Sequence, residues 1–369
     1  MERRKNPNDK FGFVNSMQYV KLGDVASYIN GYAFKPEQRG KKGLSIIRIQ
    51  DLTGNAYDLG FYNGEYPKQI EINTEDVLIS WSGSLGVYIW KGEKALLNQH
   101  IFKVVFDKLD IDKRYFCFAV KNRLESMASK THGATMKHIT KNDFNSVIIP
   151  YPSKEKQNEI ANILSTIEKN IDFRKKQLEL LDNLIKARFV EMFGDPIRNT
   201  QKRPTTELIN VVKMQRGFDL PVQERQQDGK IPVFGSNGAL DHHNVAKVKG
   251  GGVITGRSGT IGNVYYTEGD YWPLNTSLFS VDTYGNNIVY LAYLLTMYDL
   301  SRFTEGTGVP TLNRNKFHDK PIIDVSLDEQ KQFADFVQQV DKSKLAVQQS
   351  LEKTQLLFDS LMQEYFGEN

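Results

Sequence analysis

The fold of this chain is decided by the stretch from Phe144 to Asp195, FNSVIIPYPSKEKQNEIANILSTIEKNIDFRKKQLELLDNLIKARFVEMFGD, because the chain repeats it. The stretch from Phe317 to Glu368, FHDKPIIDVSLDEQKQFADFVQQVDKSKLAVQQSLEKTQLLFDSLMQEYFGE, aligns with it without a gap. The recurring residues are Phe144, Ser153, Gln157, Ala161, Lys169, Leu178, Glu179, Leu184, Glu191, Phe193 and Gly194, which return as Phe317, Ser326, Gln330, Ala334, Lys342, Leu351, Glu352, Leu357, Glu364, Phe366 and Gly367. Two copies are too few for a solenoid, so we expect a tandem duplication with pseudo-two-fold symmetry.

Length and composition indicate a multidomain, non-membrane protein. A chain of 369 residues is too long for one hydrophobic core. The net charge of +4 permits nucleic-acid binding without demanding it. The single cysteine, Cys117, excludes an internal disulfide and a cysteine-based zinc site. No apolar run is long enough for a transmembrane helix, and the N-terminus lacks the apolar stretch of a signal peptide, so we expect a cytoplasmic protein.

Changes in residue pattern divide the chain into segments of an α+β fold. We predict a flexible N-terminus (1–16), a strand-rich domain (17–152), a helix (153–193), a linker (194–204), a second strand-rich domain (205–325) and a second helix (326–367). Short runs rich in Ile, Val, Tyr and Phe predict strands at 45–49, 77–81, 86–90, 101–105, 252–255, 262–266 and 277–281. Helices are expected at 111–127 and 288–303.

The two repeated segments have the apolar spacing of a coiled coil. Ser153 is a suitable N-cap for the first, and Gly194 and Pro196 end it. The residues at heptad positions a and d form a seam, in which most are apolar. In the first helix these are Ile160, Leu164, Ile167, Ile171, Arg174, Leu178, Leu181, Ile185, Arg188 and Met192. In the second they are Phe333, Val337, Val340, Lys344, Val347, Leu351, Thr354, Phe358, Leu361 and Tyr365.

An exposed apolar seam of this length would be a large adhesive surface. We therefore predict that the two helices pair as an antiparallel coiled coil. The alternative is that both are core helices of one compact body. Arg174 and Arg188 interrupt the seam, and we expect them to extend to solvent, to pair with acids of the other helix, or to fix the register.

The two strand-rich domains are also related to each other. Ser82-Gly83-Ser84-Leu85-Gly86 in the first corresponds to Ser258-Gly259-Thr260-Ile261-Gly262 in the second. Gly31, Asn98 and Phe102 correspond to Gly217, Asn275 and Phe279. A duplicated scaffold with different loop residues indicates that the two domains recognise different targets.

This order of variable domain, long helix, variable domain and long helix resembles the specificity subunit of a type I restriction–modification system. The matching motifs are the two Ser-Gly-x-x-Gly loops, Pro310-Thr311-Leu312-Asn313 and the Phe-Gly-acid helix ends. The segments 148–152 and 157–161 also resemble the family's entry into its first helix. The first copy departs from the family pattern, because it has Lys137-His138-Ile139 where the second has Pro-Thr-Leu.

The resemblance implies that each globular domain is a target recognition domain for one half of a bipartite sequence in double-stranded DNA. It implies that the helices set the spacing between half-sites and dock two methyltransferase (M) subunits. These would methylate adenine at N6 with S-adenosylmethionine, and restriction (R) subunits would cleave DNA with ATP and Mg²⁺. The chain itself is expected to bind no cofactor and to be no enzyme.

Base readout needs polar side chains that extend from loops to the base edges, with glycines that allow close approach of the backbone. The candidates in the first domain are Lys35, Arg48, Ser82, Ser84, Thr135, Lys137 and His138. Those in the second are Arg216, Ser236, Asn237, Arg257, Ser258, Thr260, Thr311, Asn313 and Arg314. Arg257 is the strongest candidate, because an arginine that ends an apolar strand between glycines can make a bidentate contact to guanine. A phosphate contact or a plain surface position are the other possibilities for it.

Other classes of function find less support in the sequence. The pair His242-His243 lacks a third ligand at a useful spacing, so we expect no metal site. The chain contains no phosphate-binding GxxxxGK[ST] loop, dinucleotide fingerprint or GxSxG elbow. This argues against a self-contained nuclease or methyltransferase. A protein–protein scaffold with two modules on a coiled coil, which binds no DNA, remains the alternative.

Overall fold

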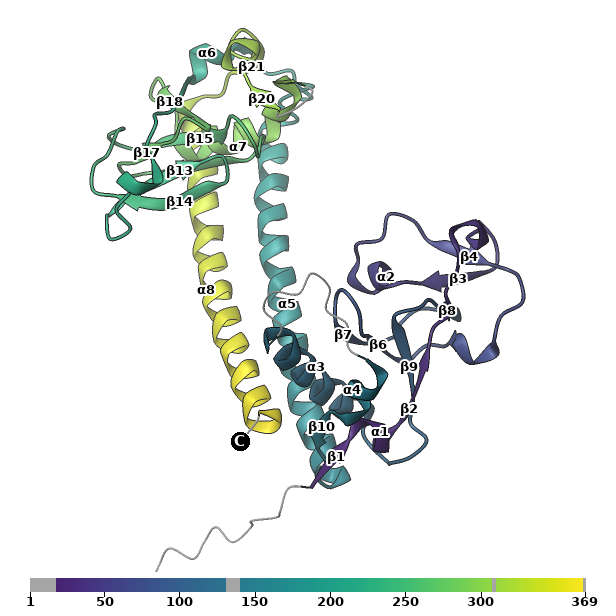
Figure 1. The fold of residues 1–369 in the computed structure, drawn as a ribbon. Coiled ribbons are helices and arrows are strands. Elements are labelled where there is room, and N and C mark those ends of the chain that lie inside the picture. Colours follow the sequence, from purple (N-terminus) through teal and green to yellow (C-terminus); the bar gives the residue numbers. More distant parts are fainter. Residues whose placement is uncertain (1–17, 131–139, 307–309, 368–369) are drawn as a thin grey trace, which may run out of the picture. The chain divides into compact units, whose positions relative to one another are not determined.

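The computed structural model describes residues 18–130, 140–306 and 310–367, which form an α+β fold of strand-rich domains and long helices (Figure 1). The chain divides into two compact units. Unit 1 comprises Met1–Asp172 and Glu352–Asn369, and unit 2 comprises Phe173–Leu351. Each unit therefore contains one strand-rich domain and a part of each long helix.

Unit 1 is built on two four-stranded sheets. The first has the order β2 (Ser27–Asn30), β9 (Ile101–Val105), β6 (Val77–Ser80) and β7 (Gly86–Ile89). The second has the order β4 (Gly60–Tyr62), β3 (Leu44–Ile47), β8 (Ala95–Leu97) and β5 (Glu71–Ile72). β1 (Tyr19–Lys21) pairs with β10 (Ile148–Pro150). The helical segments are α1 (Leu22–Val25), η1 (Pro36–Gln38), α2 (Ile49–Thr53), η2 (Lys68–Ile70), α3 (Lys113–Lys130), α4 (Lys141–Ser146) and the first part of α5 (Lys154–Phe193).

Unit 2 repeats this plan. Its four-stranded sheet has the order β12 (Lys213–Arg216), β18 (Ser277–Asp282), β15 (Gly252–Gly256) and β16 (Val264–Thr267). A three-stranded sheet contains β14 (Gly238–His243), β13 (Ile231–Gly235) and β17 (Trp272–Pro273). Two pairs, β11 (Thr205–Glu207) with β21 (Pro321–Ile323) and β19 (Thr304–Glu305) with β20 (Thr311–Leu312), complete the strands. The helical segments are α6 (Leu208–Val211), η3 (Val222–Glu224), α7 (Ile288–Tyr298), η4 (Leu300–Phe303), η5 (Arg314–Lys316) and α8 (Leu327–Phe366).

The predicted strands correspond to β3, β6, β7, β9, β15, β16 and β18, and three predicted helices correspond to α3, α5 and α8, with small errors at their ends. The other strands were not predicted. The prediction of one helix over 288–303 was wrong, because α7 ends at Tyr298. Asp299 adopts a left-handed conformation (φ 54°) and caps the separate turn η4 by accepting a hydrogen bond from the Ser301 amide. The strand predicted over 45–49 is shorter than expected, because Ile49 begins the short helix α2, which Gly54 terminates. The hairpin β13–β14 was not predicted.

Matched glutamines join each long helix to its domain. The Gln157 side chain accepts a hydrogen bond from the Asp112 amide just before α3 and donates one to the carbonyl of Pro152, both at 2.9 Å. Gln330 accepts from the Asn287 amide before α7, also at 2.9 Å, and donates to the Val325 carbonyl. Both glutamines are only 1% exposed. Their recurrence in the sequence thus follows from a repeated buried hydrogen-bond network.

Matched aromatic residues end the long helices. Phe193 ends α5 and lies edge-on to Tyr290 of α7, with ring centroids 5.2 Å apart. Phe366 ends α8 and lies 5.2 Å from Tyr115 of α3. Both phenylalanines are buried. Each long helix therefore begins against one strand-rich domain and ends against the equivalent tyrosine of the other.

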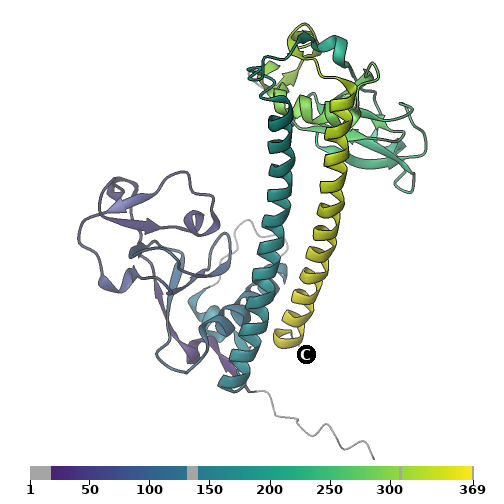
Figure 2. The ribbon, with the colours of Figure 1, turned by 180° about the vertical axis from the view of Figure 1, so that it is seen from behind.

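The long helices pair in an antiparallel sense in unit 2, where the second half of α5 lies beside the first half of α8 (Figures 1 and 2). Phe189 and Phe193 contact Phe333, whereas Asp182, earlier in α5, pairs with Lys344, later in α8, at 2.6 Å. All twenty predicted seam residues are buried or half-buried. The antiparallel coiled coil is therefore confirmed.

The polar seam residues behave in a more varied way than predicted. Lys344, for which no partner was predicted, forms an ion pair with Asp182 of the other helix. Arg188 instead pairs with Glu191 of its own helix, at 2.8 Å, and its guanidinium lies over the ring of Phe336 in α8, 5.7 Å from the centroid. A planar cation can stack on an aromatic face, so Arg188 needs no acidic partner across the seam. In the described residues, no helix is long and apolar enough to span a membrane.

Candidate nucleic-acid interface

In each unit, loops gather at one edge of a four-stranded sheet. This is the sheet β12-β18-β15-β16 in unit 2 and the sheet β2-β9-β6-β7 in unit 1. β12 and β15 both run antiparallel to β18, so their C-terminal ends and the start of β18 lie at the same edge. In unit 2 this loop edge comprises residues 216–218, 235–238, 256–262 and 274–277. In unit 1, β2 and β6 run antiparallel to β9 in the same way, and the loop edge comprises residues 30–32, 81–86 and 98–100.

Several predicted residues meet at the loop edge of unit 2. Ser258 and Thr311 form an isolated antiparallel bridge, which joins the Ser-Gly-x-x-Gly loop to the Pro-Thr-Leu segment. A side chain placed on Gly259 would lie 3.6 Å from Oγ of Ser236. Thr260 lies directly over Gly256 in the same loop. Ser236, Ser258, Thr260 and Thr311 therefore lie on one connected surface.

Arg257 lies at the centre of this surface. Its amide donates to the Thr276 carbonyl at 2.8 Å, and its carbonyl accepts from the Leu312 amide at 2.8 Å. The backbone is thus fixed on both sides, while the residue remains half-exposed. In the described part of the chain, no carboxylate lies within ion-pair distance of its guanidinium. An arginine held by its backbone with an uncommitted guanidinium can contact a base or a phosphate.

The remaining predicted residues of unit 2 flank this centre. Arg216 ends β12 and is exposed beside Gly217. Asn237 is exposed in the two-residue turn between β13 and β14. Asn313 caps η5 by accepting a hydrogen bond from the Asn315 amide at 3.1 Å, and Arg314 begins that turn. Capping leaves the amide group of Asn313 less free for base contact than its exposure suggests.

Glycines at the loop edge allow backbone segments to approach closely. A Cβ atom on Gly256 would lie 1.8 Å from the Thr260 carbonyl oxygen, and one on Gly217 would lie 2.2 Å from that of Leu274. Gly31, the counterpart of Gly217, would place a Cβ 1.9 Å from the Asn98 carbonyl oxygen. No other residue fits at these positions without movement of the backbone. The repeated glycines therefore maintain the turn geometry that presents the loop residues.

In unit 1, the predicted residues Arg48, Ser82 and Ser84 line one cavity of about 430 Å³. Arg39, Asn98, Gln99 and His100 line it as well. Ser82 is buried and Ser84 is exposed, and the Ser84 carbonyl accepts a hydrogen bond from the Ser80 hydroxyl at 2.5 Å. The cavity thus combines hydroxyl, amide and cationic groups in a concave surface at the loop edge.

Arg48 is held by acids of its own domain. Its Nε lies 3.0 Å from Asp51, its Nη1 lies 3.5 Å from Asp58, and its side chain is 13% exposed. The hydrogen bond to Asp51 raises the pKa of Arg48, although burial opposes the shift. A direct base contact by Arg48 stays a prediction, and it would require the guanidinium to leave these partners.

The other predicted residues of unit 1 lie apart from this cavity or outside the described residues. Lys35 is exposed before η1, where its amide donates to Gln38. Thr135, Lys137 and His138 lie outside the described residues. The predicted set for unit 1 is therefore only partly located.

Sequence reasoning missed three residues of the loop edge of unit 1. Trp81 stacks on Phe102 (5.6 Å), lies edge-on to His100 (5.0 Å), and donates to Asn30 at 3.2 Å. His100 has a positive φ of 71°, and Asn98 is 9% exposed. The match of Asn98 to Asn275 was visible in the duplicated sequence and could have led to this loop.

The groups on the loop edges are suited to binding. In the described part of the chain, no three His, Cys, Asp or Glu residues are grouped so that they could hold a metal ion. Hydroxyl, amide and guanidinium groups lie on the loop edges, where they can donate to and accept from base edges or phosphates.

Comparison with known proteins identifies the family. The profile described as "Type I restriction modification DNA specificity domain" matches residues 15–183 and 199–356. The EcoBI specificity subunit of Escherichia coli is 30% identical over 185 residues, which cover 49% of this chain and 39% of the relative. The MjaVIII specificity subunit of Methanocaldococcus jannaschii is 31% identical over 189 residues, which cover 48% of this chain and 41% of that protein. The aligned part is thus about two fifths of these relatives' length.

Solved structures share the fold. The crystal structure of a type I restriction–modification S subunit from M. genitalium superposes with a TM-score of 0.62 at 16% identity, covering 96% of this chain and 98% of that one. A chain from work on complex assembly and conformational transition of the type I R-M system gives a TM-score of 0.57 at 13% identity, covering 95% and 97%.

Proposed function

This chain belongs to the type I restriction modification DNA specificity domain family, and from that premise we propose that it is the DNA-recognition subunit of a type I restriction–modification complex. Each strand-rich domain recognises one half of a bipartite, asymmetric target in double-stranded DNA. The paired helices set the distance between the half-sites. The observation that carries this proposal is the pair of related loop edges, which share glycines but differ in their polar residues.

The partners proposed from the family are two M subunits and the R subunits. S-adenosylmethionine would bind to M and serve adenine-N6 methylation, whereas ATP and Mg²⁺ would bind to R and serve cleavage. This chain itself would bind none of these cofactors and would act in the cytoplasm, where these partners and the DNA meet.

The coiled coil carries a surface suited to docking of the M subunits. Phe173, Leu180 and Leu184 of α5 are 63%, 57% and 47% exposed. Their spacing places them on one face of the helix, away from the seam. Leu345 of α8 is 60% exposed as well. Apolar side chains that recur on an exposed helix face are typical of a protein interface.

The function is tested with the full chain reconstituted with its candidate M subunits. We expect the complex to select one two-part sequence with a fixed gap from a random duplex library. Selection of no motif by an assembled complex would contradict the proposal. For docking, Leu180→Lys is expected to weaken assembly, whereas Leu59→Lys, at a residue 54% exposed in the domain of unit 1, serves as the matched control.

A further inference from the structure

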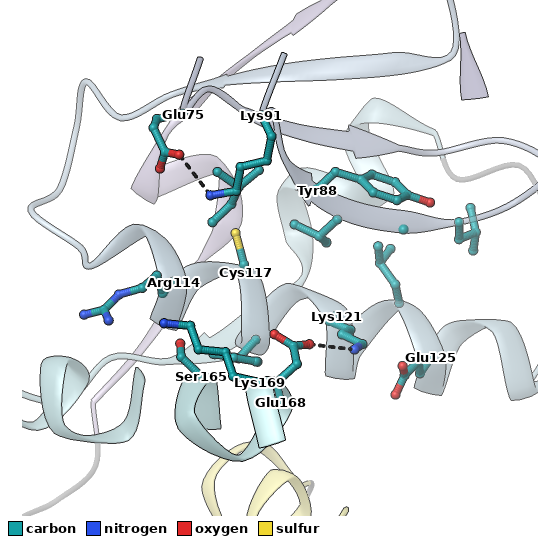
Figure 3. A pocket seen from close by; sticks show the side chains of 16 residues that line it. Glu75, Tyr88, Lys91, Arg114, Cys117, Lys121, Glu125, Ser165, Glu168 and Lys169 are labelled. Atoms are coloured by element: carbon teal, nitrogen blue, oxygen red, sulfur yellow. Dashed lines mark hydrogen bonds and ion pairs between the residues drawn. The ribbon is translucent and has the colours of Figure 1, made fainter. Parts of the chain in front are cut away.

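Unit 1 contains a second cavity, separate from its loop edge. It has a volume of about 730 Å³ and lies between β7, α3 and the first part of α5 (Figure 3). Binding pockets for small ligands usually have about 300–1,000 Å³ and mainly apolar walls with a few polar groups. This cavity has the size and the kind of lining that such pockets show.

The walls of the cavity are apolar. Leu85, Val87 and Ile89 come from the β7 hairpin, and Cys117, Phe118 and Leu124 come from α3. Burial raises the pKa of Cys117 to about 12, so its thiol is neutral and adds to the apolar surface. The interior therefore suits an uncharged, hydrocarbon-like body.

Charged residues surround the mouth, and most of them are paired. Lys91 lies 3.0 Å from Glu75, and Lys121 lies 3.7 Å from Glu168 (Figure 3). Lys121 is also placed over the ring of Phe358 of α8, 5.6 Å from its centroid. These pairs neutralise each other, so they attract neither sign of charge strongly.

Two further cations lie at one end of the cavity. Arg114 of α3 and Lys169 of α5 both line the cavity, and Figure 3 shows them on the side of Cys117 that is opposite to Glu125. Arg114 donates to Asn162 at 2.8 Å and lies 3.6 Å from Asp112. For Lys169, no ion pair to another described residue is found. This end of the cavity is complementary to an anionic group.

Unit 2 fills the equivalent space with its own side chain. Val77 pairs with Ile89 in unit 1, and Val253 pairs with Tyr266 in unit 2, so Tyr266 takes the place of Ile89. Its hydroxyl lies 3.4 Å from Asp341 of α8, the counterpart of Glu168. Tyr266 packs against the main core of unit 2 together with Tyr293 of α7. The cavity of unit 1 is thus a specific departure from the duplicated plan.

We propose that the cavity of unit 1 binds an amphipathic carboxylate, with its hydrocarbon chain between β7 and α3 and its carboxylate at Arg114 and Lys169. Apolar burial of the hydrocarbon chain supplies most of the affinity. The two cations select the charge of the head group. A cationic molecule with the same chain lacks this attraction and binds more weakly.

The site is connected to DNA recognition, and this step rests on the function proposed above. Leu85 and Gly86 line the cavity and also end the Ser82–Gly86 loop. A ligand that moves β7 against α3 therefore shifts the loop that carries Ser82 and Ser84. Occupancy is expected to change recognition of the half-site that unit 1 contacts and to leave the half-site of unit 2 unchanged.

Binding is tested on the full chain with decanoate, and with decylamine as the probe of equal chain length and opposite charge. Cys117 is the single cysteine of the chain and lines the cavity, so its rate of modification by a small neutral disulfide reagent reports occupancy, when it is measured at a fixed alkaline pH that ionises part of this high-pKa thiol. Decanoate is expected to slow this modification and decylamine to have a much smaller effect. Equal protection by both, or protection by neither, would overturn the proposal.

Two variants test the location. Ile89→Tyr copies unit 2 and should fill the cavity, which removes decanoate binding. The double variant Arg114→Gln/Lys169→Gln should weaken decanoate binding about tenfold, because it removes the two charged hydrogen-bond donors to the carboxylate. Lys175→Gln, on the same helix and outside the cavity, is the control. Unchanged binding in the Arg114/Lys169 double variant contradicts the site even if Ile89→Tyr does not fold.

The connection to recognition is measured separately, as the affinity of the reconstituted complex for duplexes altered in one half-site, with and without decanoate. A change in affinity confined to the half-site of unit 1 supports the connection between the cavity and recognition. An unchanged affinity, while decanoate protects Cys117, rejects this connection but not the binding site. Failure of the complex to bind any specific duplex would count against the proposed function, whereas the Cys117 measurement does not depend on DNA.

Discussion

The loop edges of the two units differ at one equivalent position, which is Trp81 in unit 1 and Arg257 in unit 2. Trp81 follows β6 and Arg257 follows β15, and each precedes a Ser-Gly-x-x-Gly loop. Trp81 packs on Phe102 and His100, whereas Arg257 is held through its backbone by Thr276 and Leu312. The same turn thus presents an aromatic surface in one unit and a cation in the other.

This difference separates two kinds of residue in the duplicated chain. The glycines, the buried glutamines and the aromatic helix ends recur because they maintain the fold. The side chains beyond the strand ends are free to diverge, since their replacement leaves the core intact. The following changes test whether the two kinds can be separated by experiment.

The largest effect is expected from the aromatic helix ends. Phe193→Ala and Phe366→Ala should each lower the free energy of unfolding by about 3–5 kcal/mol, because each removes a buried ring. Denaturant unfolding measures the loss. Phe173→Ala, at a residue 63% exposed, is the matched control and should change stability by about 0.5 kcal/mol or less. A Phe366→Ala chain as stable as the parent would show that the second helix end is not equivalent to the first.

Arg257→Ala should weaken binding by about 1–3 kcal/mol, or relax the preference for one base, in a single half-site. Trp81→Ala should affect only the other half-site. Both are measured with the reconstituted complex on duplexes altered in one half at a time. If the two variants affected the same half-site, the assignment of one domain to each half would be wrong.

Loss of the buried amide hydrogen bonds should cost less than loss of a buried ring. Gln157→Leu and Gln330→Leu each leave a buried backbone amide without an acceptor, which costs about 1–3 kcal/mol. Thermal or denaturant unfolding detects the change, and Gln349→Leu, on the exposed face of α8, is the control. Equal stability of the Gln157 and Gln349 variants would contradict the role of the repeated glutamine.

The smallest effect is a pH dependence confined to unit 2. Nε2 of His318 accepts a hydrogen bond from the Met214 amide at 3.1 Å, so the imidazole is neutral there. Burial, with Arg314 and Lys213 nearby, lowers the pKa of His318 below its ordinary value. Its contribution to stability is therefore complete above about pH 6.5 and is lost as the pH falls toward the lowered pKa.

Unfolding measured at pH 8 and pH 5 should show this loss in the parent and a smaller loss in His318→Gln, which retains an acceptor but does not titrate. An equal pH dependence in both chains would assign the effect to other groups.

The sequence predicted the two long helices well because their signals are local and extend over many residues. The seam from Ile160 to Met192 repeats over many turns, and all of its residues are buried or half-buried in the structure. The antiparallel pairing followed from the duplication and from the need to cover that seam. Short elements were predicted less well, since Asp299 and Gly54 end helices through local backbone geometry that residue patterns do not show.

The sequence predicted some residues of the candidate interface but not how they are arranged, and the reason is physical. Ser258 and Thr311 are distant in sequence and meet only through a bridge between loops, although both belong to recurring motifs. The engagement of Arg48 by Asp51 and Asp58 depends on a loop conformation that the sequence does not determine locally. The cavity beside β7 depends on the size of one side chain, Ile89 against Tyr266, and no motif marks it.

The most direct test of the proposed function is a map of N6-methyladenine across the genome in cells with this chain, without it, and with Arg257→Ala. Removal of the chain is expected to abolish methylation at one asymmetric, two-part motif with a fixed gap. Arg257→Ala is expected to relax or remove one half of that motif and to leave the other half and the gap unchanged. Identical maps in all three strains, with the M subunits present and active, would contradict the proposed function.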